Sequence, residues 1–167
     1  QRSEIPSVKH QDESFKKPPI LAGTWAFKVK PFPSGVLRKI KNRFCARGAL
    51  QTDVDVHEMH APVASWSSIR MLTITALQRG WETKQINFSN AFVQAPMARD
   101  VHISLPAMFG DTNGIPAHEL CLKLNKSLCG LREAPKLWGD WLKKGLMTAG
   151  FEPSSFDPTV FFGHGMA

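Results

Sequence analysis

The sequence predicts an α+β fold, with an antiparallel sheet and helices packed on one face of it. Residues 24–30 and 36–47 alternate between apolar and polar side chains around a turn with two prolines and a glycine, which is typical of a β-hairpin. Two later segments, after residue 65 and after residue 134, repeat apolar side chains at helical spacing. We therefore expect strands and helices to share one core.

The length and composition fit one globular domain or a piece of a larger one. The chain has 167 residues, 43% hydrophobic and 21% charged, and it begins with Gln1, so we expect a processed chain or a fragment. Residues 1–22 lack periodicity and predict an extended lead-in, followed by one domain over 23–167. With neither a membrane-length apolar run nor a signal segment, we expect an intracellular protein, cytoplasmic or nuclear, without a membrane partner.

Positive charge is concentrated in the first third of the chain. Residues 1–51 carry eleven Lys and Arg against three Asp and Glu, whereas residues 52–167 carry ten against eleven. A basic segment attached to a nearly neutral body is typical of proteins that bind polyanions.

The predicted hairpin has one apolar and one cationic face. The apolar face consists of Trp25, Phe27, Val29, Ile40, Phe44 and Ala46. The cationic face consists of Lys28, Lys30, Lys39, Lys41, Arg43 and Arg47. Cations held on fixed strands suit phosphate binding, but lysines also protect exposed strands from aggregation, and composition alone favours neither role.

Two amphipathic helices follow. Hydroxyl groups at and after Ser65 can cap the first helix, apolar residues recur over 69–77, and Gly80 ends it, so we expect this helix to pack under the sheet. The second helix has Pro135 in its first turn and runs to Gly150.

Three further strands are predicted, at 84–88, 101–105 and 119–124. The first of them runs into a tight turn at 89–90 and then a helix start. Polymerases and many hydrolases mount a catalytic carboxylate at such a position because a rigid strand fixes its direction. Here the position holds Asn87.

We expect no metal site from the soft ligands. The three cysteines, Cys45, Cys121 and Cys129, lack the close spacing of a zinc site and predict buried or half-buried thiols. His57 and His60 flank Glu58 without a further nearby ligand, which is more typical of an exposed loop.

The stretch QINFSNAF resembles the first catalytic motif of copia-like LTR-retrotransposon reverse transcriptases. Ile86, Phe88, Ala91 and Phe92 match that motif, and Asn87 stands where the family has its first catalytic aspartate. The resemblance implies a polymerase fold, and the departure at Asn87 implies lost activity.

Other motifs extend the resemblance over residues 18–162. GTWAFKVK followed by KNRFCARGALQ resembles the family's fingers hairpin, and SLCGLREAPKLW resembles its S-L-Y-G-L-K-Q-A/S-P-R-x-W motif. Residues 151–162 resemble the segment that follows, in which we interpret Asp157 as a turn former. Family aromatics are replaced at Ile40, His60 and Cys129.

The resemblance implies a fingers hairpin at about 24–48 and a palm portion at about 60–167. The family's Y-V-D-D motif, with the two remaining catalytic aspartates, would follow residue 167. The implied partners are an RNA or DNA template–primer, a dNTP, and the rest of the palm, thumb and RNase H parts. The family uses Mg²⁺, but Asn87 leads us to expect no metal ion or other cofactor in this chain.

The resemblance also implies roles for individual residues. Asn87 occupies the lost catalytic position, and Phe92 matches the aromatic that lies under the nucleotide sugar. The implied nucleotide- and phosphate-binding residues are Lys41, Arg43, Arg47, Phe88, Phe92, Gly130 and Arg132.

Three functional hypotheses follow. The first is an inactive fragment or remnant of a retrotransposon RNA-directed DNA polymerase. The second is a non-catalytic nucleic-acid-binding module that uses the basic hairpin, and the third is a structural or interaction protein whose lysines maintain solubility. An incomplete palm exposes an unpaired sheet edge and an apolar face, so we also expect self-association unless a partner covers them.

Overall fold

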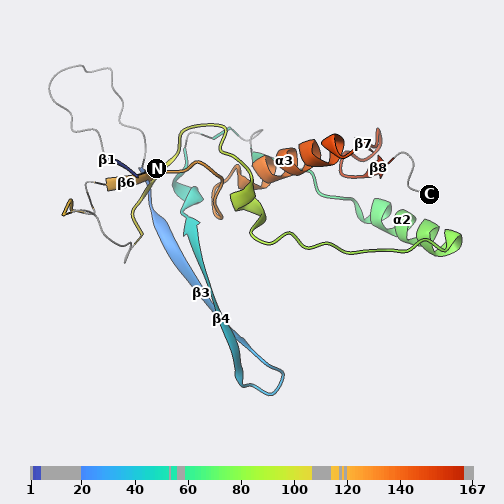
Figure 1. Ribbon diagram of the computed structural model, residues 1–167, viewed down its shortest axis with the longest axis horizontal. Helices are drawn as coiled ribbons and strands as arrows, with labels where there is room; N and C mark the ends of the chain where they lie inside the picture. The colour runs from blue at the N-terminus through green and yellow to red at the C-terminus, as the bar shows by residue number, and fades with distance from the viewer. Residues whose placement is uncertain are drawn as a thin grey trace.

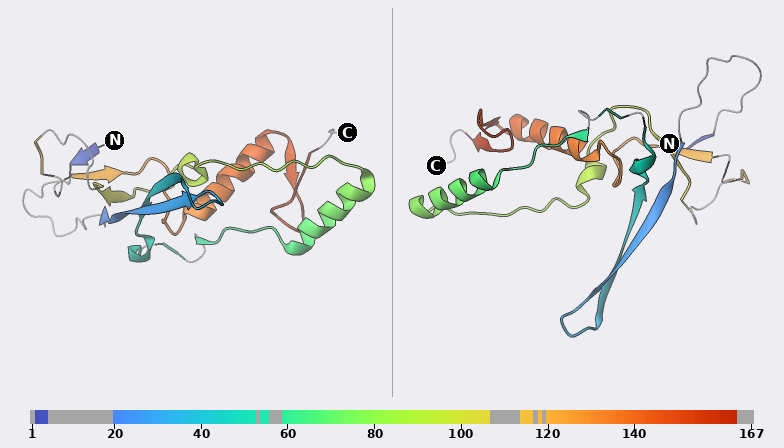
Figure 2. Two further views of the ribbon diagram at one scale, coloured as in Figure 1. Left: turned by 90° about the horizontal axis from the view of Figure 1, so that it is seen from below. Right: turned by 180° about the vertical axis from the view of Figure 1, so that it is seen from behind.

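The computed structural model describes residues 2–4, 20–52, 54–55, 59–106, 114–116, 118 and 120–163. Most of the predicted lead-in lies outside the described residues, as do His57, Glu58 and Glu119. A long two-stranded arm projects from a small mixed α/β body, and helix α2 lies far from the base of that arm (Figure 1). The view from behind, on the right of Figure 2, shows the same separation of arm, body and helix.

The arm is the predicted hairpin. Strand β3 (Gly23–Pro31) pairs antiparallel with β4 (Leu37–Ala46), and the register places Trp25 opposite Phe44 and Lys28 opposite Lys41. Both predicted faces are therefore confirmed along the paired strands, and Arg47, which we expected on the cationic face, lies beyond the end of β4. Gly35 closes the turn with φ +82°, a conformation that glycine adopts without a steric penalty.

The single antiparallel sheet that the sequence predicts is absent from the described residues, although mixed α and β content is confirmed. Strands β1 (Arg2–Glu4), β6 (Leu120–Lys123), β5 (His102–Ser104) and β2 (Ile20–Leu21) form a small sheet in that order, in which β2 and β5 are parallel. A separate antiparallel pair joins β7 (Phe151–Pro153) to β8 (Phe161–Gly163).

The prediction of a strand at 84–88 is wrong. Residues 81–88 are irregular and exposed, although the turn at 89–90 forms and Asn90 adopts φ +51°. A short 3₁₀ helix, η2 (Ala91–Gln94), follows the turn. Within the described part of the chain no strand pairs with this segment, so its backbone groups gain no ladder of hydrogen bonds.

Helix α2 (Trp66–Arg79) forms as predicted, but its predicted packing is wrong. Ser65 caps it by accepting a hydrogen bond from the Ser68 amide at 3.0 Å, and Gly80 ends it with φ +64°. Its apolar side chains are largely exposed, with Ile69 at 43% and Leu77 at 78%. The expected sheet is not present over this helix among the described residues.

Helix α3 (Ala134–Thr148) begins with Pro135 in its first turn, as predicted. Trp138 and Trp141 stack along it, with ring centroids 5.5 Å apart. Neither it nor any other described helix has the length and apolar composition needed to cross a membrane.

The buried core lies where the hairpin base meets the small sheet and the start of α3. Ile103 on β5 is fully buried and Ala134 is nearly so. The core cluster consists of Leu21, Ala46, Val101, Ile103, Leu131 and Ala134. The hairpin is thus anchored at its base, while its outer part lies free of the body.

Candidate functional site

The cationic face of the hairpin gathers five positive side chains on two paired strands. The register sets Lys28 opposite Lys41, Lys30 opposite Lys39, and Arg43 opposite Ala26. All five cations are exposed. A shallow groove of about 410 Å³ lies against this face, and its lining consists of Ala26, Lys28, Lys30, Lys41 and Arg43 together with Phe27 from the opposite face.

The cations on this face repel one another. The pKa of Lys41 is lowered mainly by the neighbouring Arg43 guanidinium, with smaller contributions from partial burial and from Lys30, Lys39 and Lys28. A phosphate bound here would relieve that repulsion. The face is therefore suited to a polyanion or a triphosphate.

The base of the hairpin contacts the turn that precedes α3 through backbone atoms. The Ala46 amide donates to the Cys129 carbonyl at 2.8 Å. Gly130 has φ +93°, and a Cβ atom on it would lie 2.1 Å from the Ala46 carbonyl oxygen. A Cβ atom on Gly48 would likewise lie 2.0 Å from the Gly130 carbonyl oxygen. Both glycines are thus used for close packing within the protein.

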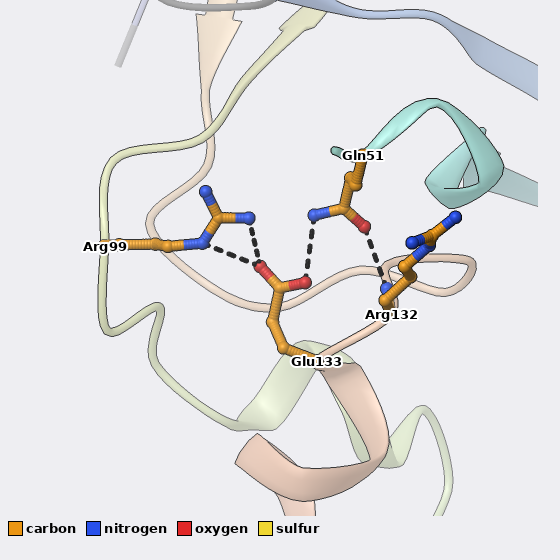
Figure 3. Close-up of polar contacts among 4 residues, drawn as sticks. All are labelled: Gln51, Arg99, Arg132 and Glu133. Carbon is orange, nitrogen blue, oxygen red and sulfur yellow. Dashed lines mark hydrogen bonds and ion pairs between the residues drawn. The ribbon is translucent and has the colours of Figure 1, made fainter. Parts of the chain in front are cut away.

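A buried polar network lies beside this junction (Figure 3). The Glu133 carboxylate is 4% exposed and accepts hydrogen bonds from Gln51 Nε2 at 2.9 Å and from Arg99 Nη2 at 2.9 Å. Gln51, which is 1% exposed, accepts from the Arg132 amide at 2.8 Å. The network joins the end of the hairpin to the start of α3.

Sequence reasoning missed Gln51, Arg99 and Glu133. Their positions are 34 to 82 residues apart, so no local spacing relates them. Only Glu133 had a feature in the sequence that could have indicated a structural role. It is a charged residue inside a motif that leads directly into helix α3.

The predicted aromatic residues lie against α3. Phe88 packs edge-on against Trp138, with ring centroids 5.2 Å apart. Phe92 packs against the buried core and lines a largely apolar hollow of about 380 Å³ with Trp138, Leu142 and Phe161. Both aromatics therefore have packing contacts within the protein.

Asp157 acts as a turn former, as predicted. Its carboxylate accepts hydrogen bonds from the Ser68 hydroxyl at 2.5 Å and from the Thr159 hydroxyl and amide at 2.6 and 3.0 Å. These bonds, that of Ser68 foremost, hold the pKa of Asp157 well below its ordinary value. The carboxylate joins the start of α2 to the β7–β8 connection.

The predicted site residues fall into separate groups. Lys41 and Arg43 lie out along the arm, while Arg47 flanks the junction that contains Gly130 and Arg132. Phe88 and Phe92 lie at α3, and Asn87 lies on the exposed irregular segment.

The predicted thiols are placed as expected, since Cys45 and Cys129 are half-buried and Cys121 is buried. Within the part of the chain that the structure describes, no group of three or more His, Cys, Asp or Glu side chains lies close enough to hold a metal ion. His60 is exposed.

The described residues thus form an exposed cationic hairpin on a mixed α/β body. A family described as reverse transcriptase (RNA-dependent DNA polymerase) matches residues 12–166. The chain belongs to this family, as a copia-like reverse transcriptase domain.

Plant retrotransposon polyproteins are among the relatives. The chain is 35% identical over 143 residues to the retrovirus-related Pol polyprotein from transposon RE1 of Arabidopsis thaliana, and 32% identical to that from transposon RE2 of the same plant. It is 30% identical over 139 residues to the Pol polyprotein from transposon TNT 1-94 of Nicotiana tabacum. These matches cover 83 to 85% of this chain but only 10% of each relative. No solved structure matches the chain.

Proposed function

We propose that this stretch forms the fingers and part of the palm of a copia-like reverse transcriptase, and that the 167-residue chain does not extend a primer. The division is a fingers hairpin at about 24–48 and a palm portion from about residue 60. We infer the lack of activity from Asn87, which stands at the position of the family's first catalytic aspartate.

The chemistry of metal binding supports this proposal. Mg²⁺ prefers anionic oxygen ligands, and an Asn amide offers only a neutral carbonyl oxygen. Asn87 is exposed on an irregular segment, and the described residues bring no cluster of acids to it. These residues do not fit a two-metal site, so we assign no step of catalysis to a metal ion here.

The cationic face of the hairpin is proposed to hold phosphate. Lys41 and Arg43 are the residues that would contact a dNTP triphosphate or the backbone of a template strand. Arg132 is exposed at the junction, where its guanidinium donates a hydrogen bond to the Ala49 carbonyl at 3.2 Å, and it is proposed to contact the same nucleic acid.

A primer-extension assay tests the proposal. The chain is incubated with a template–primer, all four dNTPs and either Mg²⁺ or Mn²⁺, and an Asn87→Ala variant serves as the matched control. We expect no extension above that control. Extension by the unmodified chain that the variant loses would show that the amide at position 87 supports catalysis, against the proposal.

A second function is favoured by the segregation of charge on the hairpin. A binding module needs only the cationic face, and that face is complete without position 87. The two functions differ in their response to nucleotide. An affinity for template–primer that increases when the complementary dNTP is added supports the polymerase origin. An affinity that the dNTP leaves unchanged supports the binding module.

A further inference from the structure

The hairpin has a second exposed surface, opposite its cationic face. We call it the apolar hairpin face, and it consists of Trp25, Phe27, Val29, Ile40 and Phe44. The register places Trp25 opposite Phe44 and Val29 opposite Ile40, so these side chains form one continuous surface over both strands. Phe27 is 68% exposed and Ile40 is 61% exposed.

This surface is more regular than the other exposed apolar regions. Trp25 stacks on Phe27 with ring centroids 6.2 Å apart and packs on Phe44 at 5.2 Å, and the paired strands fix the backbone. The exposed apolar residues of α2, by contrast, include neighbours such as Met71 and Leu72 that point in different directions around the helix. A preorganised surface loses less conformational entropy when a partner covers it.

Charge separation indicates the kind of partner. Five of the hairpin cations lie on the opposite face, and Phe27 faces the neutral Asn42 across the strands. A sixth cation, Arg38, lies at the register irregularity near the turn, where its guanidinium is 5.7 Å from the centroid of the Phe32 ring. Two copies that meet through their apolar hairpin faces would turn both cationic faces outward, as far from each other as the two sheets allow. The same approach by the cationic faces would be repulsive.

The available area is sufficient for a modest dimer. Trp25, Phe27, Val29 and Ile40 are 42 to 68% exposed, whereas Phe44 is partly buried against the core. The four exposed side chains offer on the order of 500 Å² per copy. Two copies would therefore bury roughly 1,000 Å² in total, which is near the lower limit for a specific interface. The sheets would pack face to face about 10 Å apart, as in a β-sandwich.

From these observations we infer that two copies of this chain associate by packing their apolar hairpin faces together around a two-fold axis. Each apolar hairpin face is then buried by its own counterpart, and the dimer presents two outward cationic faces. The inference does not depend on catalytic activity or on nucleic-acid binding.

Sedimentation velocity of the full chain over a range of concentrations tests the dimer. A Phe27→Thr, Ile40→Thr double variant keeps β-forming residues but removes apolar surface. The matched control is Phe162→Thr, because Phe162 is a strand residue of β8 with 53% exposure. We expect a concentration-dependent dimer whose Kd rises at least tenfold in the double variant and stays within twofold in the control.

A single Asn42→Lys variant keeps the test decisive if the double variant does not fold. It leaves every apolar side chain in place and introduces a like charge at the centre of each copy's interface, so the dimer should weaken at least tenfold as well. A chain that remains monomeric throughout the concentration range overturns the inference. Equal weakening of the dimer by Phe162→Thr also overturns the inference. That result would mean that the copies associate non-specifically through any exposed apolar side chain.

A competing occupant is a single-stranded nucleic acid whose bases stack on the aromatic rings. Binding of an oligothymidine to dilute, monomeric chain distinguishes the two. If Phe27→Thr with Ile40→Thr weakens this binding tenfold while self-association is unchanged, the apolar hairpin face binds bases and the inferred dimer is wrong.

Discussion

At the scale of single residues, Glu133 shows how the fold accommodates a buried charge. It is a buried carboxylate whose oxygens are used by Gln51 and Arg99. Burial of a charge is tolerated only when hydrogen bonds and an opposite charge compensate for the lost water. Loss of one member of this network would therefore leave the buried polar groups of the others uncompensated at the junction between the hairpin base and α3.

We predict that Glu133→Ala destabilises the fold by about 2–4 kcal/mol, since it removes the buried carboxylate that Gln51 and Arg99 share as an acceptor. The free energy of unfolding by urea measures this loss. The control is Lys136→Ala, which removes an exposed ion pair with Asp140 on the same helix and should change stability by less than about 0.5 kcal/mol. Equal effects of the two variants would mean that the buried network adds nothing.

Asp157 makes stability depend on pH in the acid range. Its pKa is lower in the folded chain than in the unfolded chain, so the unfolded chain binds more protons as the solution is acidified. Its stabilising contribution is complete above the ordinary aspartate pKa of about 3.9 and is lost as the pH falls further toward the folded value.

We therefore predict that the chain loses more stability between pH 5 and pH 2.5 than an Asp157→Asn variant does. Asp100, whose pKa is also lowered, chiefly by its hydrogen bond from Lys123, is present in both proteins and cancels in the comparison. Thermal unfolding followed across this range gives the difference. Parallel curves for the two proteins would show that the hydrogen bonds to Asp157 do not stabilise the folded state.

At the scale of elements, the alternation of residues 24–47 was enough to predict the hairpin, its turn and both of its faces, because strand pairing within a hairpin is local. The caps Ser65 and Gly80 likewise predicted α2. The strand at 84–88 was wrong because a strand needs a partner, and a partner distant in sequence leaves no mark on local alternation.

The contact of Gly130 with the hairpin base is a second element-scale feature. We predict that Gly130→Ala destabilises by more than about 2 kcal/mol, because the new Cβ atom meets a backbone oxygen that cannot move easily. Gly150→Ala is the matched control, since Gly150 also has a positive φ but open space around it, and should lose about 1 kcal/mol. Denaturant unfolding that ranks the two variants equally would contradict the close packing of the junction.

At the scale of the whole molecule, the family motifs identified the class of protein but did not predict how its parts lie. Lys41, Gly130 and Phe92 belong to neighbouring motifs of one resemblance, yet they lie on the arm, at the junction and beside α3. The network around Glu133 could not be predicted, because a side chain's burial depends on segments that meet only in the folded chain.

Both functions considered for this chain depend on one claim, that the cationic face of the hairpin binds phosphate. The salt dependence of binding to a short duplex with a single-stranded overhang tests it most directly, with Lys41→Ala plus Arg43→Ala compared against Lys143→Ala plus Lys144→Ala, two exposed cations on α3. The slope of log K against log salt is negative. We expect its magnitude to decrease by about two in the hairpin variant and to stay unchanged in the α3 variant. An unchanged slope in the hairpin variant, or an equal fall in both, would contradict the claim.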